Sequence, residues 1–177
     1  GPADVFVMPQ TEEQLIEILR KADEEGIAVT VIGGGSNTLV SDKGIRGITI
    51  CMNRMKQEMT CEGEWITASG GTGTGTVARF AEKNGLKGFE WAVGIPGTVC
   101  GAVFMNANGY GSQMKRVVEE VYAITRDGKE KKTYGWDDLH YGDSDSVFMH
   151  NGDIIVGVKL HLSPGNPEEI KREMTEH

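Results

Sequence analysis

Residues 28–40, AVTVIGGGSNTLV, constrain the fold of this chain more than any other segment. The β-branched apolar run at residues 28–32 predicts a strand, and three consecutive glycines follow it directly. Glycine amides carry no Cβ beside them, so they can approach an anion closely and can adopt positive φ. The pattern indicates either a phosphate-binding turn or an ordinary tight turn between strands, and by itself it does not choose between them.

The preceding sequence predicts a β-α-β unit. Residues 4–8 form a short apolar strand that Pro9 stops, and Thr11 to Gln14 match a capping box. Gly26 ends a helix whose apolar residues have helical spacing: Leu15, Ile18, Leu19 and Ala22. The two strands are expected to be parallel, with the glycines at a carboxyl strand end, where α/β sheets bind ligands. No long helix follows the glycines, so the segment is neither a P-loop nor a Rossmann fingerprint.

Two further glycine-rich stretches follow. Residues 69–75 lie between a predicted strand and a helix that ends at Asn84 and Gly85. In the longer stretch, residues 94–111, Thr98 is expected to cap a short helix that begins with small side chains. Small residues there allow either close packing of the helix on a sheet or the approach of a large flat ligand to the backbone.

The last third of the chain reads as mainly β. Asp127 and Gly128 between strand-like runs predict a hairpin, and residues 153–162 predict a further strand. Residues 140–148 are expected to be irregular. Residues 168–177 predict the start of a charged helix without an apolar face of its own.

Charge and composition exclude several function classes. The formal net charge of −8 argues against a nucleic-acid or acidic-membrane surface, so an anionic ligand would have to be held by local amides and dipoles. The three cysteines and four histidines show no metal-ligand spacing, and no apolar run is long enough to span a bilayer. An odd number of cysteines without a CxxC motif suits a reducing cytosol, so a cytoplasmic location is expected.

The glycine stretches, taken in order, carry a family resemblance. The chain resembles the FAD-binding domain of UDP-N-acetylenolpyruvylglucosamine reductase, which has the vanillyl-alcohol-oxidase (PCMH) type of flavin fold. The match rests on GPAD at residues 1–4, GGGSNTLVSDKGIRG at 33–47, GLKGFEWAVGIPGTVCGAVFMNANGYG at 85–111 and DIIVGVKLHL at 153–162.

The resemblance implies an α+β fold made of two α/β subdomains. Residues 1–50 would form a small β-α-β subdomain, and residues 51–165 a larger mixed or antiparallel sheet flanked by helices. Residues 166–177 would begin a helix or linker toward a C-terminal substrate domain, which is absent from this chain.

The same resemblance implies a function in peptidoglycan precursor synthesis. In the family, NADPH reduces bound FAD, and the flavin passes hydride to the enolpyruvyl ether of the UDP-sugar to give UDP-N-acetylmuramate. The implied partners are FAD, NADPH and the UDP-sugar, with no metal, nucleic acid or membrane. The protein would supply position and electrostatics, and the flavin the redox chemistry.

The cofactor-binding residues carried over by position fall into three groups. Those expected to hold the FAD pyrophosphate are Gly33, Gly34, Gly35, Ser36 and Asn37. Those expected to line the second half of the cofactor site are Gly94, Ile95, Pro96, Gly97, Thr98 and Gly101. Ile155, in the late strand, is the expected neighbour of the flavin.

The chain also departs from the family pattern. The family's catalytic arginine, which follows a tyrosine, falls on Gly142 or Ser144, and neither is a cation. The family's proton-donating serine and catalytic glutamate belong to the substrate domain, past His177. Cys100 replaces a family glycine, and its thiol could crowd the cofactor. We therefore expect a flavin-binding chain that is catalytically incomplete by itself.

Two other interpretations remain open. In one, the missing groups come from another chain or from rearranged side chains, and the activity is complete. In the other, the chain is a non-catalytic module of the flavin fold that binds FAD or another nucleotide for interaction or regulation.

Overall fold

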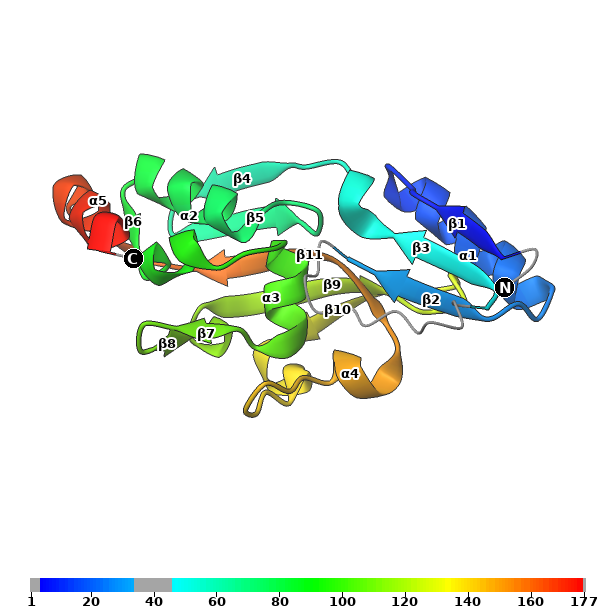
Figure 1. Ribbon diagram of the computed structural model, residues 1–177. Coiled ribbons are helices and arrows are strands. Elements are labelled where there is room, and N and C mark those ends of the chain that lie inside the picture. Colours follow the sequence, from blue (N-terminus) through cyan, green and yellow to red (C-terminus); the bar gives the residue numbers. More distant parts are fainter. Residues whose placement is uncertain (1–3, 34–45, 177) are drawn as a thin grey trace.

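The computed structural model describes residues 4–33 and 46–176, which form a small parallel sheet beside a larger antiparallel sheet (Figure 1). Helices pack on both sheets. Residues 34–37 of the first glycine stretch lie outside the described residues.

The small sheet has the strand order β1-β3-β2, with both pairings parallel. Its elements are β1 (Val5–Val7), α1 (Glu12–Glu24), β2 (Val29–Ile32) and β3 (Ile48–Cys51). The predicted β-α-β unit is confirmed, with β3 inserted between its two strands. Thr11 caps α1 as expected, because its side chain accepts from the Gln14 amide at 3.1 Å. The Gln14 side chain accepts from the amide of Gln10 instead of completing the capping box.

The larger sheet has the order β10-β9-β11-β5-β4, and every neighbouring pair is antiparallel. Its strands are β4 (Met59–Glu62), β5 (Trp65–Ser69), β9 (Val118–Ile124), β10 (Lys131–Gly135) and β11 (Ile154–His161). The hairpin predicted at Asp127 and Gly128 joins β9 to β10, and Gly128 has φ +75°. The last long strand, β11, occupies the centre of the sheet.

Helices and short ladders complete the second half of the molecule. The helices are α2 (Thr74–Lys83), α3 (Val99–Met105), α4 (Phe148–Asn151) and α5 (Pro167–Glu176). The 3-10 helices are η1 (Met52–Arg54), η2 (Glu90–Gly94), η3 (Met114–Arg116) and η4 (Trp136–Leu139). The short strands are β6 (Leu86–Lys87), β7 (Asn108–Gly109), β8 (Ser112–Gln113) and β12 (Ser163–Pro164).

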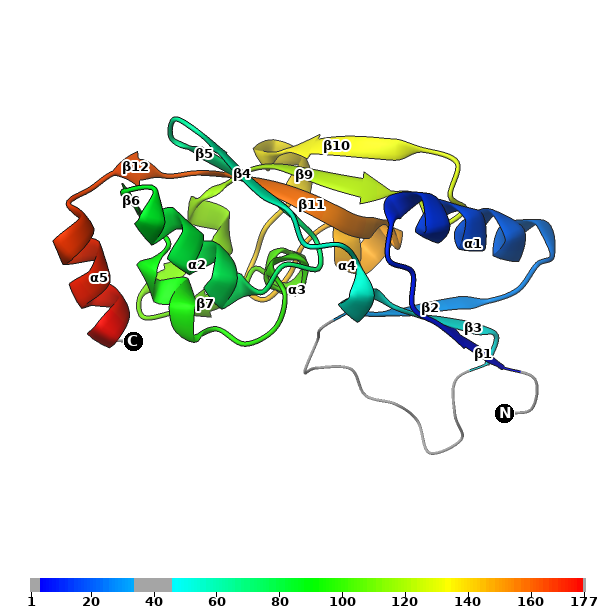
Figure 2. The ribbon, with the colours of Figure 1, turned by 90° about the horizontal axis from the view of Figure 1, so that it is seen from above.

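Two apolar clusters hold the fold together. The larger one includes the inner residues of α2, α3 and the antiparallel sheet, together with Phe89 and Trp91. The smaller one joins the two sheets, since Leu15 and Leu19 of α1 pack with Ile124 of β9 and Val156 of β11. Figure 2 shows α1 lying beside the ends of β9 and β10. The small sheet is therefore attached to the larger one through a shared core.

The expectation that the C-terminal helix has no apolar face is wrong. Ile170 and Met174 of α5 are buried and lie one turn apart on the same side of the helix. This side packs against η2, α2 and β6. Two apolar residues at this spacing are enough to dock a short helix, although they look sparse within a charged sequence.

Candidate functional site

The first predicted part of the site begins at the end of β2. Gly33 follows the strand, whereas Gly34, Gly35, Ser36 and Asn37 lie outside the described residues. Figures 1 and 2 both show the carboxyl end of β2 directed toward the part of the molecule that carries α3. An ideal Cβ on Gly33 would have no described atom within 4 Å, and φ of Gly33 is not positive. Neither packing among the described residues nor backbone strain requires a glycine at this position.

The second predicted part is a loop that leads from η2 into α3. Gly94 ends η2, and Gly97 adopts φ +91°, a conformation that favours glycine. The Gly97 carbonyl accepts from the amide of Thr74 at 3.0 Å, which ties the loop to the start of α2. Thr98 caps α3 as predicted, since its hydroxyl accepts from the Gly101 amide at 3.2 Å. The exposed residues Pro96 and Gly97 therefore sit on an anchored turn.

Gly101 is a second glycine that packing does not demand. An ideal Cβ there would meet only the Thr98 hydroxyl within 4 Å, at an ordinary contact distance of 3.5 Å. Glycine inside a helix costs about 1 kcal/mol relative to alanine. Despite this cost, α3 has a glycine at position 101, so a half-buried stretch of its backbone carries no side chain.

The glycines of residues 69–75 are required by close packing. An ideal Cβ on Gly70 would lie 2.5 Å from the Cys100 sulfur, and one on Gly71 would lie 2.8 Å from the Met55 carbonyl oxygen. A Cβ on Gly75 would be 3.1 Å from the carbonyl oxygen of Val93. This stretch is glycine-rich because backbone and side chains pack directly on it, whereas a Cβ at Gly33 or Gly101 would not collide with the described residues.

Ile155 lies in the central strand of the larger sheet. The residue is only 7% exposed, it belongs to the larger apolar cluster, and α3 packs across the same strand. The structure thus brings Ile155 and the helix of Gly101 into one region. It gives no contact between these residues and Gly33.

The segment that would carry the family's arginine closes the end of α3 instead. Gly142 and Asp145 pair across a tight turn, in which exposed Ser144 has φ +50°. The Tyr141 hydroxyl donates to the Val103 carbonyl at 2.8 Å, and Ser146 donates to the next carbonyl of α3. Burial raises the pKa of Tyr141, so the hydroxyl stays protonated and remains a donor.

Asn106 is a structural residue of this region to which the sequence assigned no role. It is 1% exposed and follows α3 in the left-handed conformation, with φ +48°. Its amide nitrogen donates to Gln113 and to the Gly142 carbonyl, each at 3.0 Å, and its amide oxygen accepts from the Lys115 backbone at 3.0 Å. An asparagine at a helix end is a known signal for a left-handed cap and could have identified the position.

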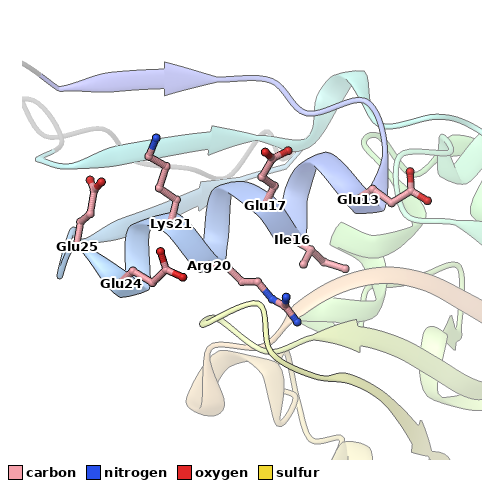
Figure 3. A pocket seen from close by; sticks show the side chains of 7 residues that line it. All are labelled: Glu13, Ile16, Glu17, Arg20, Lys21, Glu24 and Glu25. Atoms are coloured by element: carbon pink, nitrogen blue, oxygen red, sulfur yellow. The ribbon is translucent and has the colours of Figure 1, made fainter.

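Other features of the described residues lie apart from this region. A hollow runs along the charged outer side of α1, lined by Glu13, Ile16, Glu17, Arg20, Lys21, Glu24 and Glu25 (Figure 3). Within residues 4–33 and 46–176, no cluster of His, Cys, Asp or Glu is arranged to hold a metal ion. No helix in these ranges is long and apolar enough to span a membrane.

Curated relatives are similar to the chain over nearly its whole length. The UDP-N-acetylenolpyruvoylglucosamine reductase of Lactiplantibacillus plantarum is 40% identical over 176 residues, which cover 99% of this chain and 58% of that protein. The reductase of Geobacillus kaustophilus is 39% identical over 174 residues, or 98% of this chain and 57% of that protein. The chain therefore spans less than two thirds of these relatives.

Solved structures agree with the predicted fold. The UDP-N-acetylenolpyruvylglucosamine reductase of Thermus caldophilus matches 97% of this chain and 60% of its own, with a TM-score of 0.77 and 31% identity. A cholesterol oxidase variant from Brevibacterium sterolicum matches 90% of this chain and 34% of its own, with a TM-score of 0.65 and 14% identity, which supports the fold alone. The α+β, PCMH-type flavin fold predicted from the sequence is confirmed. Because the model of the FAD binding domain matches residues 3–134, the chain belongs to this family of FAD-binding domains.

Proposed function

We propose that this chain is the FAD-binding part of an NADPH-dependent reductase that converts UDP-N-acetylglucosamine enolpyruvate to UDP-N-acetylmuramate. The observation that carries the proposal is the open backbone at Gly33 and Gly101, where a Cβ would meet no crowding among the described residues. The reductases to which the chain is similar support the choice of substrate. A cytoplasmic location is part of the same proposal.

The residues proposed to hold the cofactor would act mainly through their backbone. Gly33, Gly34, Gly35, Ser36 and Asn37 would bind the pyrophosphate, and Ile155 would lie beside the flavin. The second half of the cofactor would contact Gly94, Ile95, Pro96, Gly97, Thr98 and Gly101. In a chain with a net charge of −8, local N–H dipoles have to stabilise the phosphates. Bound FAD would supply the hydride-transfer chemistry.

We further propose that the chain is catalytically incomplete by itself. Hydride addition to the enolpyruvyl group develops negative charge, and loss of a group that stabilises such charge costs orders of magnitude in rate. The turn at Gly142 and Ser144 offers no cation of its own, and its neighbours Tyr141 and Ser146 are engaged with α3. The same observation favours the second candidate function, a non-catalytic module that binds FAD or another nucleotide.

The cofactor assignment is tested by titrating FAD into the purified chain and following the flavin fluorescence. The parent chain should bind FAD, and Gly33→Leu and Gly34→Leu should abolish binding by placing a side chain where a phosphate oxygen approaches. Thr60→Leu adds the same side chain at an exposed position of β4 and should bind like the parent. Parent-like binding by both glycine variants would contradict the assignment.

Gly101→Ala provides an independent test, because its effects on stability and on binding should have opposite signs. Alanine favours a helix over glycine by about 1 kcal/mol, so the variant without FAD should melt at a higher temperature. The added methyl group should lower the affinity for FAD. A variant that gains both stability and affinity would exclude close approach of the cofactor to α3.

An activity assay separates the two candidate functions from a complete enzyme. The chain with FAD should not oxidise NADPH when the enolpyruvyl UDP-sugar is added. Substrate-dependent oxidation would overturn the proposed incompleteness. Absence of any flavin binding by the parent chain would overturn the proposed function itself.

A further inference from the structure

The turn between β9 and β10, residues 125–130, lies directly against α1. The Arg20 side chain of α1 donates to the Gly128 carbonyl at 3.1 Å, and Figure 3 shows Arg20 extending toward this turn. An ideal Cβ on Gly128 would lie 2.9 Å from the Ile16 carbonyl oxygen, so no larger residue fits without a shift of the helix. The hairpin of the larger sheet thus touches the backbone of α1, the helix that packs on the small sheet.

Within this turn, Arg126 connects three segments that are distant in sequence. Its Nη1 donates to the carbonyl of Val29 at 2.6 Å, across 97 residues, and its Nε donates to the carbonyl of Gly152 at 3.1 Å. Val29 is the first residue of β2, and Gly152 precedes β11. A guanidinium group is a rigid planar fork, so two such bonds fix the relative position of the two acceptors.

The two strands held by this fork carry different parts of the proposed cofactor site. β2 ends immediately before Gly33, and β11 contains Ile155. An extended strand is stiff over a few residues, so a rotation at Val29 would displace Gly33 relative to β11. Resting on the proposed function, we propose that Arg126 is a positioning residue that sets the distance and angle between the two halves of the FAD site.

Two other cations of the hairpin, Lys129 and Lys131, do not perform this task. Lys131 forms an ion pair with Glu12 at 2.8 Å, and Lys129 approaches Asp23 at 3.9 Å. Both ion pairs are exposed and reach α1 rather than β2, and exposed pairs contribute little to stability. Lys131 is therefore a matched control: its removal changes the net charge by the same amount without releasing β2.

Two effects are expected without the fork: a smaller fraction of molecules has its two halves correctly placed, and the halves that bind FAD hold the flavin in an altered arrangement. Apparent affinity falls in proportion to this fraction, so a chain that is competent one tenth of the time binds FAD about tenfold more weakly. Arg126→Ala should show a loss of this order. Arg126→Lys keeps the charge, but its single ammonium group cannot reproduce the fork, so it should also bind more weakly than the parent.

The test compares the parent, Arg126→Ala, Arg126→Lys and Lys131→Ala by FAD titration, by the visible circular dichroism of the flavin at saturation, and by melting without FAD. Lys131→Ala should match the parent affinity within about twofold. Both Arg126 variants should bind more weakly and show an altered flavin dichroism. A merely structural Arg126 would lower the melting temperature and leave the dichroism unchanged.

The outcomes distinguish the two proposals. Parent-like affinity in both Arg126 variants, or an unchanged dichroism in both, overturns the positioning role while the FAD site stands. Absence of FAD binding in the parent overturns the proposed function and this inference with it. Because Arg126→Lys keeps the positive charge at an exposed position, it keeps the test decisive if Arg126→Ala fails to fold.

Discussion

The sulfur of Cys100 occupies the space in which Gly70 would carry a Cβ: an ideal Cβ on Gly70 would lie 2.5 Å from it. The Gly70 amide donates to the Val156 carbonyl at 2.8 Å, so the backbone of Gly70 is held in place beside β11. Burial raises the pKa of the Cys100 thiol, which therefore stays protonated at neutral pH. In the described residues the thiol faces the second glycine stretch, and Cys100 and Gly70 act as a complementary pair.

Gly70→Ala should therefore destabilise the chain. The added methyl group would collide with the sulfur and would press on the Val156 backbone, 3.2 Å away. Overpacking of this kind costs about 1–3 kcal/mol of unfolding free energy. Chemical denaturation of the parent and the variant measures the loss.

A double-mutant cycle tests whether the thiol is the cause. In Cys100→Gly the space is open, so Gly70→Ala should cost less in that background than in the parent. Equal costs in the two backgrounds would show that the Val156 backbone, rather than the sulfur, rejects the methyl group.

Asn106→Ala should be among the more damaging substitutions outside the apolar core. It removes three hydrogen bonds at a buried position and leaves a left-handed residue without its compensating contacts. Lost bonds and strain together predict a loss of about 2–4 kcal/mol in unfolding free energy. Asn106→Gly relieves the strain and should recover part of this loss, whereas an alanine variant as stable as the parent would contradict the network.

Thr98→Ala should weaken the start of α3. The hydroxyl that accepts from the Gly101 amide is lost, at a cost of about 1 kcal/mol. Thr98→Ser keeps the hydroxyl and should remain close to the parent in thermal melting. If serine and alanine cost the same, the cap does not stabilise the helix.

A pair of carboxyl groups should make the docking of α5 dependent on pH. A hydrogen bond to Glu90 raises the pKa of Glu173, and the nearby charges of Glu169 and Glu176 act in the same direction. Burial raises the pKa of Glu90, but hydrogen bonds from Glu173 and from the Gly88 amide outweigh it, so the net shift is downward. These opposite shifts predict that the two side chains share one proton between η2 and α5.

The sign of the effect follows from linkage. Because the folded pKa of Glu173 is raised, its stabilising contribution is complete below the pKa of a free glutamate and is lost as pH rises through the raised value. The contribution of Glu90 is present above its unfolded pKa and is lost as pH falls through its lowered value. Between these limits the shared proton holds α5, so raising the pH from the ordinary glutamate pKa through the raised value of Glu173 should loosen the helix.

Glu173→Gln should remove this dependence, because its amide donates to Glu90 at every pH. The difference in melting temperature between this variant and the parent should grow as the pH rises. Glu168→Gln removes a negative charge from the same helix at an exposed position and serves as the control. A constant difference across the pH range would exclude the shared proton.

Local signals in the sequence predicted many elements correctly. The caps at Thr11 and Thr98 and the hairpin at Gly128 depend on residues within a few positions of one another, so a short window contains their physical cause. The match of the glycine stretches to a family added the flavin fold, which no single stretch specified.

Features that depend on residues far apart in the chain could not be predicted from short windows of the sequence. The bond from Arg126 to Val29 crosses 97 residues, and the contact of Cys100 with Gly70 needs two separate glycine stretches to meet. The apolar side of α5 was missed because Ile170 and Met174 gain significance only once η2 and β6 are in place to receive them. The cofactor assignments of all the site residues remain predictions.

The central position of β11 has a consequence for the order in which the chain can fold. In the larger sheet, β5 and β9 both pair with β11 and not with each other, although β11 is translated last of the three. Before β11 has been translated, the larger sheet can form only its two outer hairpins, β4-β5 and β9-β10. Each of these hairpins has an unpaired edge. Closing a sheet through such non-local pairings is slow, and open edges invite aggregation. Synthesis of this chain should therefore be most vulnerable to misassembly just before its central strand emerges.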